Sequence, residues 1–497
     1  MNIESAANSP HVGDWINGGA VHIGASQYIN LFNPSSGEVI AQVPVNDAAV
    51  VDRAVQSASA AFATWSRVPV LQRGKILFSY RELLTRHSED LVQLICEENG
   101  KTFEEAKGDV ARGIEVVEFA TGVPHLLKGE RLSELASNID GETIRQPLGV
   151  CAGITPFNFP AMVPMWMYPL AIACGNSFVL KPSEKTPLTA NRLAELFSQA
   201  GLPDGVFNIV HGQKEVVDAL CVHPDVSAVS FVGSSHVAEH VYKLAAAHKK
   251  RVQASGGAKN VLLVMPDANL ESATRAIIGS AFGCAGQRCM AGSLLIAVGN
   301  VAQPLRDRVV AAMDQLVLDD TLKNRQAGMG PVIDMRSRDR LLAIIDEAGG
   351  QPVELVRDGR EQLPERGYFV GPTLFDHVPP GDKLATTELF GPLLSMMRAD
   401  SLHEAVEWVN SLKYGNGATI FTGSGAAARQ FCNDIQCGMV GVNVGVPAPM
   451  AVFPFSGWND SFYGDLHVQG EEGVQFYTRQ KVVLSRWDSQ YIRQMGW

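Results

Sequence analysis

The chain has 497 residues, more than one hydrophobic core usually organises, so at least two domains are expected. Hydrophobic residues make up 46% of the chain and charged residues 19%, which excludes an intrinsically disordered protein. The net charge of −11 opposes attraction to nucleic-acid phosphates and to anionic membranes. We therefore expect small-molecule partners, no nucleic acid and no membrane.

Helical patterns dominate the first quarter of the chain, and β-like runs follow them. The predicted helices are residues 47–65, 71–98 and 102–120. The predicted strands, most of which end at Gly or Pro, are residues 141–150, 149–156, 176–182, 206–212, 228–233 and 251–257. Because the strands after residue 149 alternate with helical patterns, they predict a parallel sheet with crossover helices, which is a doubly wound α/β domain.

A second α/β series begins after Gly256 and Gly257, where we expect a domain boundary. Its predicted strands are residues 260–266, 293–299, 417–422 and 438–444, and its predicted helices are residues 270–281 and 302–316. The closing residues 473–487 alternate like a β-strand. They are predicted to pair with residues 126–146 as an extension used for subunit contact.

Two short motifs suggest other chemistry. Gly423-Ser424-Gly425 follows a predicted strand like a dinucleotide fingerprint, but no acidic residue closes a second strand about 20 residues later, so an ordinary strand-to-helix turn is favoured. His236 and His240, with Glu239 between them, match the HxxEH pattern of zinc peptidases. Because no third ligand is evident, we favour exposed helical side chains and no metal, and keep a zinc hydrolase as the remote alternative.

The eight cysteines are scattered without a CxxC pair, which predicts reduced thiols. No secretion signal or membrane-length apolar stretch is recognisable, so a cytoplasmic location is expected. Cys289 lies among Gly and small residues between a predicted helix and a predicted strand, in a loop that a substrate can approach. This segment alone fits a reactive thiol and an inert buried one equally well; Cys284, nearer the helix end, is predicted to pack.

Several separated motifs occur in a fixed order, namely TPFNFP (155–160), LKPSEKTP (180–187), SFVGS (230–234), GQRC (286–289) and ELFGP (388–392). Together they resemble the aldehyde dehydrogenase superfamily over nearly the whole chain. The resemblance implies an aldehyde-dehydrogenase-like α/β fold that assembles as a homo-oligomer, either a dimer or a tetramer. Its implied parts are an NAD-binding domain (1–125 and 147–255), a catalytic domain (256–455) and a bridging or oligomerisation region (126–146 and 470–497).

The resemblance also assigns the catalytic roles. Cys289 would be the nucleophile, whose thiolate attacks the aldehyde carbon and forms a tetrahedral oxyanion. Asn158 matches the family's side-chain donor to that oxyanion, and the Cys289 backbone N–H would be the second donor. Hydride transfer to NAD would then leave a thioacyl enzyme.

Cofactor positions carry over from the same motifs. Lys181, with Ser183 and Glu184 nearby, is similar to the adenosine-ribose ligand, and Gly233 and Ser234 open a helix that would face the pyrophosphate. The remaining implied NAD contacts are Glu388 and Phe390 at the nicotinamide ribose, and Thr155, Pro156 and Phe157 along the cofactor groove. Since no 2′-phosphate-binding Arg accompanies Glu184 in its motif, NAD is favoured over NADP.

The chain departs from hydrolytic relatives at the position of a general base. Those relatives carry a glutamate before Gly-Gly, where this chain has Ala254 and Ser255, and residues 464–470 lack the family's second candidate base. Transfer of the acyl group to a thiol cosubstrate is therefore favoured over hydrolysis. The segments QASGGAKN, MPDAN and GQRCMA resemble the coenzyme A (CoA)-acylating branch that acts on malonate and methylmalonate semialdehyde.

Substrates of that branch carry a carboxylate, and Arg112 and Arg288 match its carboxylate-binding arginines. A planar guanidinium can grip a carboxylate through two hydrogen bonds. Oxidation would place a thioester carbonyl β to the substrate carboxylate, which favours loss of carbon dioxide. The expected products are acetyl-CoA or propionyl-CoA, and the alternative is a hydrolytic NAD-dependent semialdehyde dehydrogenase that releases a free acid.

Overall fold

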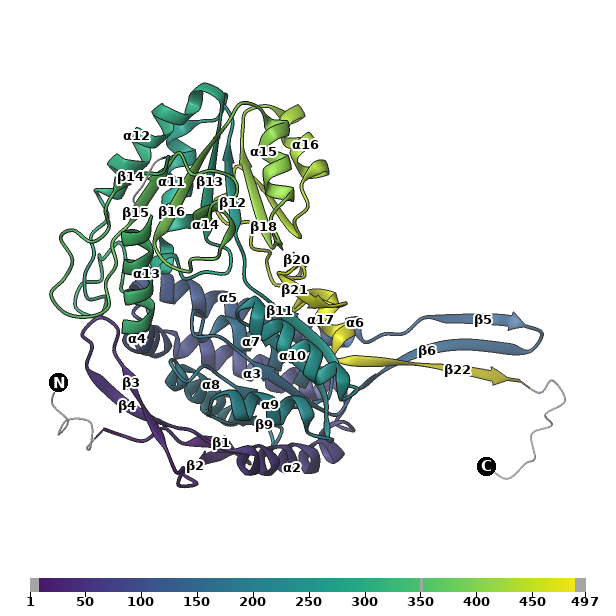
Figure 1. Ribbon diagram of the computed structural model, residues 1–497. Helices are drawn as coiled ribbons and strands as arrows, with labels where there is room; N and C mark the ends of the chain where they lie inside the picture. Colours follow the sequence, from purple (N-terminus) through teal and green to yellow (C-terminus); the bar gives the residue numbers. More distant parts are fainter. Residues whose placement is uncertain (1–8, 349–351, 488–497) are drawn as a thin grey trace, which may run out of the picture.

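The computed structural model describes residues 9–348 and 352–487, which form two large sheets, their helices and a projecting arm (Figure 1). The predicted residues 488–497 of the oligomerisation region and residues 1–8 of the NAD-binding domain lie outside the described part. Within that part, none of the helices combines the length and the apolar character needed to span a membrane.

The first sheet has eight strands in the order β2-β1-β9-β8-β7-β10-β11-β21. Its five central strands are parallel, as predicted: β7 (Val150–Ile154), β8 (Ser177–Lys181), β9 (Phe207–Ile209), β10 (Val226–Val232) and β11 (Arg251–Ser255). Three-residue strands extend both edges in antiparallel fashion, namely β1 (Asp14–Ile16), β2 (Gly19–Val21) and β21 (Phe462–Gly464). The strand β21 thus returns the C-terminal part of the chain to the first sheet.

Helices cover both faces of this sheet. The N-terminal ones are α2 (Ala48–Trp65), α3 (Val70–Arg86), α4 (Ser88–Asn99), α5 (Phe103–Thr121) and α6 (Val123–Leu126), and the crossover helices are α7 (Met162–Ala173), α8 (Pro187–Gln199), α9 (Lys214–Val222) and α10 (Ser235–Ala247). The predictions for α2 and α5 are confirmed. The single helix predicted at 71–98 is wrong, because the chain leaves helical geometry at His87 and a new helix starts with Glu89 and Asp90 in its first turn.

The second sheet has seven strands in the order β14-β15-β16-β13-β12-β18-β19, and all neighbours except β14 and β15 run parallel. The strands are β12 (Asn260–Val264), β13 (Gly292–Val298), β14 (Glu354–Arg357), β15 (Thr373–Asp376), β16 (Leu393–Ala399), β18 (Gly417–Phe421) and β19 (Met439–Val442). The chain passes from one sheet to the other between Ser255 and Asn260, beside the predicted boundary. Since β7, β8, β10 and β11 run parallel, their C-terminal ends share the edge of the first sheet from which the chain leaves for the second sheet.

Helices also surround the second sheet: α11 (Leu270–Ala281), α12 (Ala302–Met313), α13 (Met335–Glu347), α14 (Lys383–Thr386), α15 (Leu402–Asn410), α16 (Gly425–Asp434) and the short 3-10 helices η1 (Gly283–Gly286) and η2 (Gly299–Val301). The prediction for α11 is confirmed, and α12 ends at Met313 instead of residue 316. Two further sheets have two strands each, β3 (Tyr28–Phe32) with β4 (Val39–Pro44) and β17 (Tyr414–Gly415) with β20 (Trp458–Asn459).

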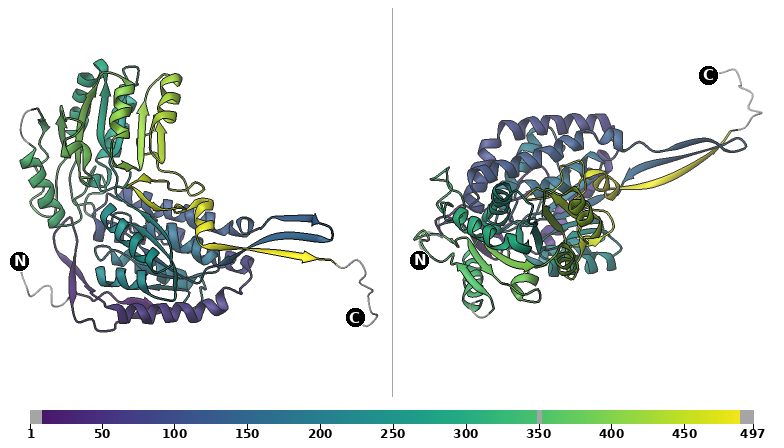
Figure 2. Two further views of the ribbon diagram at one scale, coloured as in Figure 1. Left: turned by 45° about the vertical axis from the view of Figure 1, so that its right-hand side comes forward. Right: turned by 90° about the horizontal axis from the view of Figure 1, so that it is seen from above.

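A three-stranded antiparallel arm projects from the body in every view (Figures 1 and 2). It consists of β5 (Arg131–Ala136), β6 (Ile139–Pro147) and β22 (Thr478–Arg486), and it confirms the predicted pairing of the chain's end with residues before 147. The β character predicted for residues 473–477 is wrong, since they lie in or directly after α17 (Gly470–Phe476). Val474 and Phe476 are buried there near α7, so tertiary packing overrides the alternating pattern.

Candidate active site

Cys289 lies in the loop between η1 and β13, and its position depends on an unusual backbone before it. Cys284 and Ala285 have φ values of 52° and 51°, in the left-handed region, so the chain turns sharply after α11. Gly286 follows at φ 69°, and a Cβ there would lie 2.1 Å from the carbonyl oxygen of Gly391. The loop therefore packs closely against the segment after Glu388 and leaves Cys289 half-buried.

Two asparagine side chains fix the carbonyl group of Cys289. Asn260 Nδ2 donates to this oxygen at 2.8 Å, and Asn416 Nδ2 donates at 3.0 Å. Asn260 also holds the carbonyl of Ala291 at 3.1 Å. The peptide that follows the thiol is thus anchored to β12 and to the segment before β18, and neither asparagine was predicted as a site residue.

Asn158 meets the same loop from the first sheet. Its side chain is buried in the segment after β7, and its Nδ2 donates to the carbonyl oxygen of Gln287 at 3.0 Å. A primary amide carries two N–H groups, so one is left for another acceptor. The predicted oxyanion donor is thus bonded to a residue that lies two positions before the predicted nucleophile.

Cys289, Arg112 and Arg288 line one cavity of about 410 Å³. Its apolar wall comes from the segment between β7 and α7, from α7 itself and from the segment after β19. The wall includes Phe159, Met162, Trp166, Val446 and Phe455. The two arginines, 176 residues apart in the sequence (288 minus 112), are brought to the thiol by α5 and by the cysteine loop. The cavity thus offers a small apolar chamber with cationic side chains beside a thiol.

Every carboxylate that lines this cavity is matched with a cation. The pairs are Glu104 with Lys107, Glu105 with Arg288, Asp109 with Lys101 and Glu115 with Arg112. Among the described residues Arg288 has three acceptors, namely Cys284 Sγ at 3.2 Å, the Gly279 carbonyl at 3.3 Å and Glu105 Oε1 at 3.4 Å. Since a guanidinium has five N–H groups, two remain available for a ligand.

The residues predicted to bind NAD gather at the C-terminal ends of the first sheet's parallel strands. Thr155 N donates to the Lys181 carbonyl at 3.1 Å, and Gly233 N donates to the Ser255 carbonyl at 3.1 Å. Lys181 Nζ lies 3.1 Å from Glu184 Oε2, with Ser183 buried between them, and Ser234 is the N-cap of α10. Parallel α/β sheets bind ligands at this edge.

Two buried hydroxyl groups at this edge, Thr155 Oγ1 and Ser255 Oγ, have no hydrogen-bond partner within residues 9–348 and 352–487. Buried polar atoms are rarely left unpaired, so their presence fits a groove that takes a polar ligand. Phe157 and Phe390, which are 233 residues apart (390 minus 157), meet edge to face with ring centres 5.8 Å apart. Pro156 is half-buried beside them.

Glu388 is held where the two sheets meet. Its Oε1 accepts from Ala258 N at 3.0 Å, and a Cβ on Gly257 would lie 2.2 Å from its Oε2, so the carboxylate needs glycine beneath it. Burial raises the pKa of Glu388 to about 7. Lys259, buried nearby with an unpartnered Nζ, has its pKa lowered to about 7 by the same loss of hydration, which the charge of Glu388 opposes.

The surroundings of Cys289 oppose ionisation of its thiol. Burial and then the negative charge of Glu388 raise its pKa to about 12, while backbone N–H groups and Arg288 act in the opposite direction. Cysteine reacts as the thiolate, so cofactor or substrate must change this environment if the thiol is to act near neutral pH.

Alkylation of Cys289 by iodoacetamide should therefore rise by about tenfold per pH unit between pH 7 and 10, because the thiolate fraction grows that steeply below the pKa. Glu388→Gln removes a negative charge that raises the pKa, so it should speed labelling at each pH. Peptide mass spectrometry measures both rates. A plateau in labelling below pH 9 would contradict the raised pKa.

The two competing motifs have other partners. Gly423 and Thr422 donate to the carboxylate of Asp267, so a carboxylate occupies the turn where a dinucleotide phosphate would have to sit, and the predicted strand-to-helix turn from β18 to α16 is confirmed. His240 Nε2 lies 2.7 Å from Asp218, and Glu239 lies 2.5 Å from Lys243, while His236 is exposed on α10.

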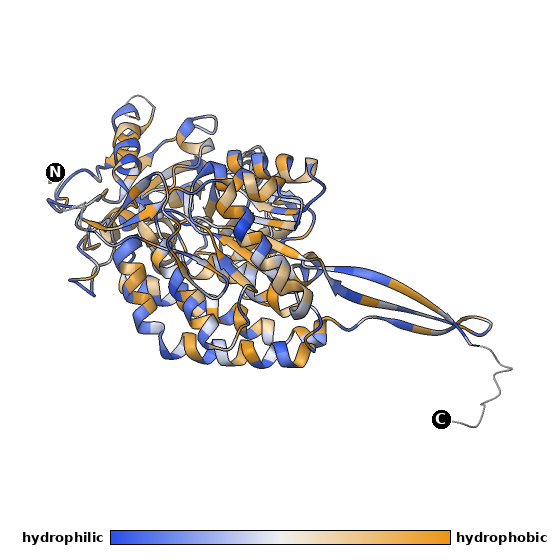
Figure 3. Ribbon diagram, turned by 90° about the horizontal axis from the view of Figure 1, so that it is seen from below, coloured by the Kyte–Doolittle hydropathy of each residue, from blue (hydrophilic) through white to orange (hydrophobic). Residues whose placement is uncertain are grey.

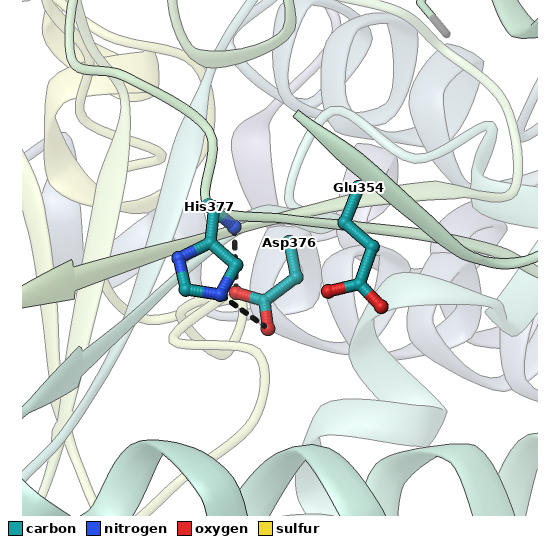
Figure 4. A group of neighbouring side chains, drawn as sticks. All are labelled: Glu354, Asp376 and His377. Carbon is teal, nitrogen blue, oxygen red and sulfur yellow. Dashed lines mark hydrogen bonds and ion pairs between the residues drawn. The ribbon is translucent and has the colours of Figure 1, made fainter. Parts of the chain in front are cut away.

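Glu354, Asp376 and His377 form a different cluster of potential metal ligands at the edge of the second sheet (Figure 4). Arg306 donates to Glu354 at 2.8 Å and to Asp376 at 3.1 Å, and Arg398 also holds Asp376. These guanidinium groups already balance the two carboxylates. None of the residues predicted for the active site belongs to this cluster.

At the two positions where hydrolytic relatives carry a base, this chain has an apolar side chain and a histidine that is already hydrogen-bonded. Ala254 is fully buried within β11, where it packs in the apolar core on one face of the first sheet. Within residues 464–470, His467 Nδ1 lies 2.9 Å from Glu472 and its Nε2 lies 3.2 Å from the Gly457 carbonyl.

Comparison with known proteins places this geometry in context. Residues 22–483 match the aldehyde dehydrogenase family. Malonate-semialdehyde dehydrogenase 1 of Geobacillus kaustophilus (strain HTA426) is 52% identical over 477 residues, which cover 96% of this chain and 97% of that protein. Malonate-semialdehyde dehydrogenase 2 of Geobacillus thermodenitrificans (strain NG80-2) is 55% identical over 456 residues, covering 91% and 94%.

Solved structures agree in fold. The crystal structure of methylmalonate-semialdehyde dehydrogenase from Oceanimonas doudoroffii has a TM-score of 0.95 and 44% identity, and the match covers 97% of this chain and 99% of that one. A candidate methylmalonate-semialdehyde dehydrogenase from Sinorhizobium meliloti 1021, crystallised with NAD, gives the same values.

Proposed function

This chain belongs to the aldehyde dehydrogenase family, and from that premise we propose that it oxidises malonate semialdehyde, methylmalonate semialdehyde or both with NAD and passes the acyl group to CoA. The observation that carries the proposal is the meeting of Cys289, Arg112 and Arg288 around one small cavity. A thiol beside two guanidinium groups suits an aldehyde that also bears a carboxylate.

In this mechanism Cys289 Sγ bonds to the aldehyde carbon, and the aldehyde oxygen becomes an oxyanion. The free N–H of Asn158 and the backbone N–H of Cys289 would stabilise that oxygen in the transition state. The acceptor for the hydride that leaves this carbon would be supplied by bound NAD. The bonds from Asn260 and Asn416 to the Cys289 carbonyl keep the thiol's backbone fixed while a thioester forms on its sulfur.

For the cofactor, the strand ends carry the buried Thr155 and Ser255 hydroxyls, which have no hydrogen-bond partner among the described residues. Lys181, Ser183 and Glu184 would bind the adenosine ribose, where the negative Glu184 disfavours a 2′-phosphate and hence NADP. The other assigned contacts are Gly233 and Ser234 at the pyrophosphate, Glu388 and Phe390 at the nicotinamide ribose, and Thr155, Pro156 and Phe157 along the groove.

For the substrate, Arg112 bonds to one acceptor among the described residues, Glu115, and its guanidinium is partly exposed, while Arg288 has two N–H groups to spare. We assign the substrate carboxylate to these donors. Once the aldehyde carbon is oxidised to a thioester, the carboxylate is β to a carbonyl and can leave as carbon dioxide through an enolate.

For acyl transfer, the paired state of the cavity carboxylates and the apolar Ala254 argue against activation of water. A thiol is itself a strong nucleophile, so CoA can relieve the thioester without such a base. The products would be acetyl-CoA from malonate semialdehyde and propionyl-CoA from methylmalonate semialdehyde.

The experiment that tests this function measures NADH formation from malonate semialdehyde with and without CoA, and identifies the product by mass. We expect NADH formation to stop after about one turnover per site without CoA, since the thioester then has no acceptor, and to continue with CoA while acetyl-CoA accumulates. Sustained turnover that releases free acid without CoA would instead support the hydrolytic alternative.

Arg112→Ala should lower kcat/KM for malonate semialdehyde roughly 10- to 100-fold, because a hydrogen bond to a charged group is worth about 1.5–3 kcal/mol. Propanal, which lacks the carboxylate, should react with the variant as well as with the unmodified enzyme. Arg275→Ala, on α11 and paired with Glu271 at 3.1 Å, is the control on another helix. Equal losses for both aldehydes would remove Arg112 from substrate recognition.

We also propose that the chain assembles as a homo-oligomer, a dimer or a tetramer, through the arm. Apolar side chains stand exposed along its strands, including Leu132, Leu135, Val482 and Leu484, and orange patches interrupt the polar arm in Figure 3. Exposed apolar surface of this kind favours a protein partner.

We place the enzyme in the cytoplasm. Its eight cysteines are free thiols, which suit that reducing compartment.

A further inference from the structure

The segment that carries Asn158 is held on both sides, by the last residue of α4 and by the short connection from α4 to α5. Asn99 Nδ2 donates to the Phe157 carbonyl at 2.8 Å, on the residue before Asn158. Lys101 Nζ lies 3.6 Å from the centre of the Phe159 ring, on the residue after it. Two side chains that are two positions apart, one at the end of α4 and one just after it, thus contact both neighbours of Asn158.

Asp109, on α5, links Lys101 to the start of α7. Asp109 Oδ1 accepts from Met162 N at 2.7 Å, and its Oδ2 lies 2.7 Å from Lys101 Nζ. Asp109 therefore uses one oxygen to hold the helix after Asn158 and the other to hold Lys101 over Phe159. Asp109 and Phe159 both line the cavity that contains Cys289.

The ion pair between Lys101 and Asp109 is fully enclosed, with side-chain exposures of 1% and 0%. A buried ion pair is a poor source of stability, because removing two charges from water offsets most of their attraction. Apolar residues of similar volume would serve the fold as well. The pair is better explained by what it fixes, namely a ring and a helix start on the wall of the cavity.

In the part of the chain that the structure describes, the Asn158 side chain makes one hydrogen bond, from Nδ2 to the Gln287 carbonyl. The direction of its remaining N–H therefore depends on the backbone at residues 157–159. A displacement of about 1 Å in a reacting geometry can cost about 100-fold in rate.

We propose that Asn99, Lys101 and Asp109 are positioning residues that aim the Asn158 amide at the oxyanion. This inference rests on the proposed function, which makes Asn158 an oxyanion donor. The three residues act through the backbone around Asn158. They fix the carbonyl of Phe157, the ring of Phe159 and the start of α7. Neither the family motif at 155–160 nor the sequence spacing singles them out.

The test uses two variants, Asn99→Ala and the double variant Lys101→Met with Asp109→Asn, which leaves no buried charge unpaired. Glu98→Gln is the matched control, since Glu98 is fully buried one residue away but accepts from Leu188 N and Thr189 N at the start of α8. Thermal unfolding confirms folding, and if the double variant does not fold, Asn99→Ala decides alone.

Single-turnover NADH formation from malonate semialdehyde is measured for each variant, with and without Asn158→Ala in the same chain. We expect each positioning variant to slow this step about 10- to 100-fold, with unchanged affinity for NAD. In the Asn158→Ala background the same substitutions should add little further loss, because they act through that amide. Glu98→Gln should leave the step unchanged in both backgrounds.

Two results would overturn the inference while leaving the proposed function intact. One is an undiminished further loss in the Asn158→Ala background, and the other is an equal loss from Glu98→Gln. If Asn158→Ala alone keeps the full rate, the oxyanion assignment in the proposed function is wrong, and the inference falls with it.

Discussion

Cys289→Ala should abolish aldehyde oxidation while NAD still binds. The sulfur is the only atom in the proposal that bonds to the substrate, so its removal leaves binding and the oxyanion donors with no nucleophile to assist. In enzymes of this kind, loss of the nucleophile costs at least about 10⁴-fold in kcat. The initial rate of NADH formation and the dissociation constant for NAD, from calorimetry, measure the two effects separately.

Cys284→Ala is the control for that substitution, because Cys284 is the neighbouring thiol and accepts from Arg288 Nε at 3.2 Å. Burial raises the pKa of Cys284, as expected for a packed thiol. We expect this variant to retain turnover, with any loss confined to the affinity for the carboxylate-bearing substrate. If Cys284→Ala abolished turnover and Cys289→Ala did not, the nucleophile would be misassigned.

Asn158→Ala should lower kcat by about 100- to 1,000-fold with little change in KM, because removal of one oxyanion donor affects the transition state more than the bound aldehyde. Steady-state kinetics with malonate semialdehyde and CoA measures both constants. The control is Asn191→Ala, on α8, whose amide donates to the Gly13 carbonyl far along the first sheet. A rise in KM at constant kcat would show that Asn158 binds the ground state only.

Much of the fold follows from local pattern. The alternation of apolar strands with helices predicts the five parallel strands of the first sheet, since each strand is buried on both faces. The pairing of β22 with β6 was also predictable, because both segments alternate like strands. The break at His87 and the three-residue strands β1 and β21 were not, since tertiary contacts decide such short elements.

Some residues of the site could be predicted from the sequence, and others could not. Cys289, Asn158 and Glu388 stand in motifs that can be read along the chain, and the fold brings Cys289 and Asn158 to one loop. Asn416, which holds the Cys289 carbonyl from 127 positions away, lies in no such motif. The pairing of Arg288 with Glu105 likewise depends on how α5 packs beside the cysteine loop. Residue type and spacing along the sequence do not predict such long-range contacts.

The most direct measurement is the mass of the peptide containing Cys289, from enzyme quenched after it has formed NADH from malonate semialdehyde without CoA. We predict an acyl adduct on Cys289 that disappears when CoA is added, in step with the appearance of acetyl-CoA. An adduct on another residue, or continued turnover with no adduct at all, would contradict a reaction in which one sulfur takes the acyl group and another removes it.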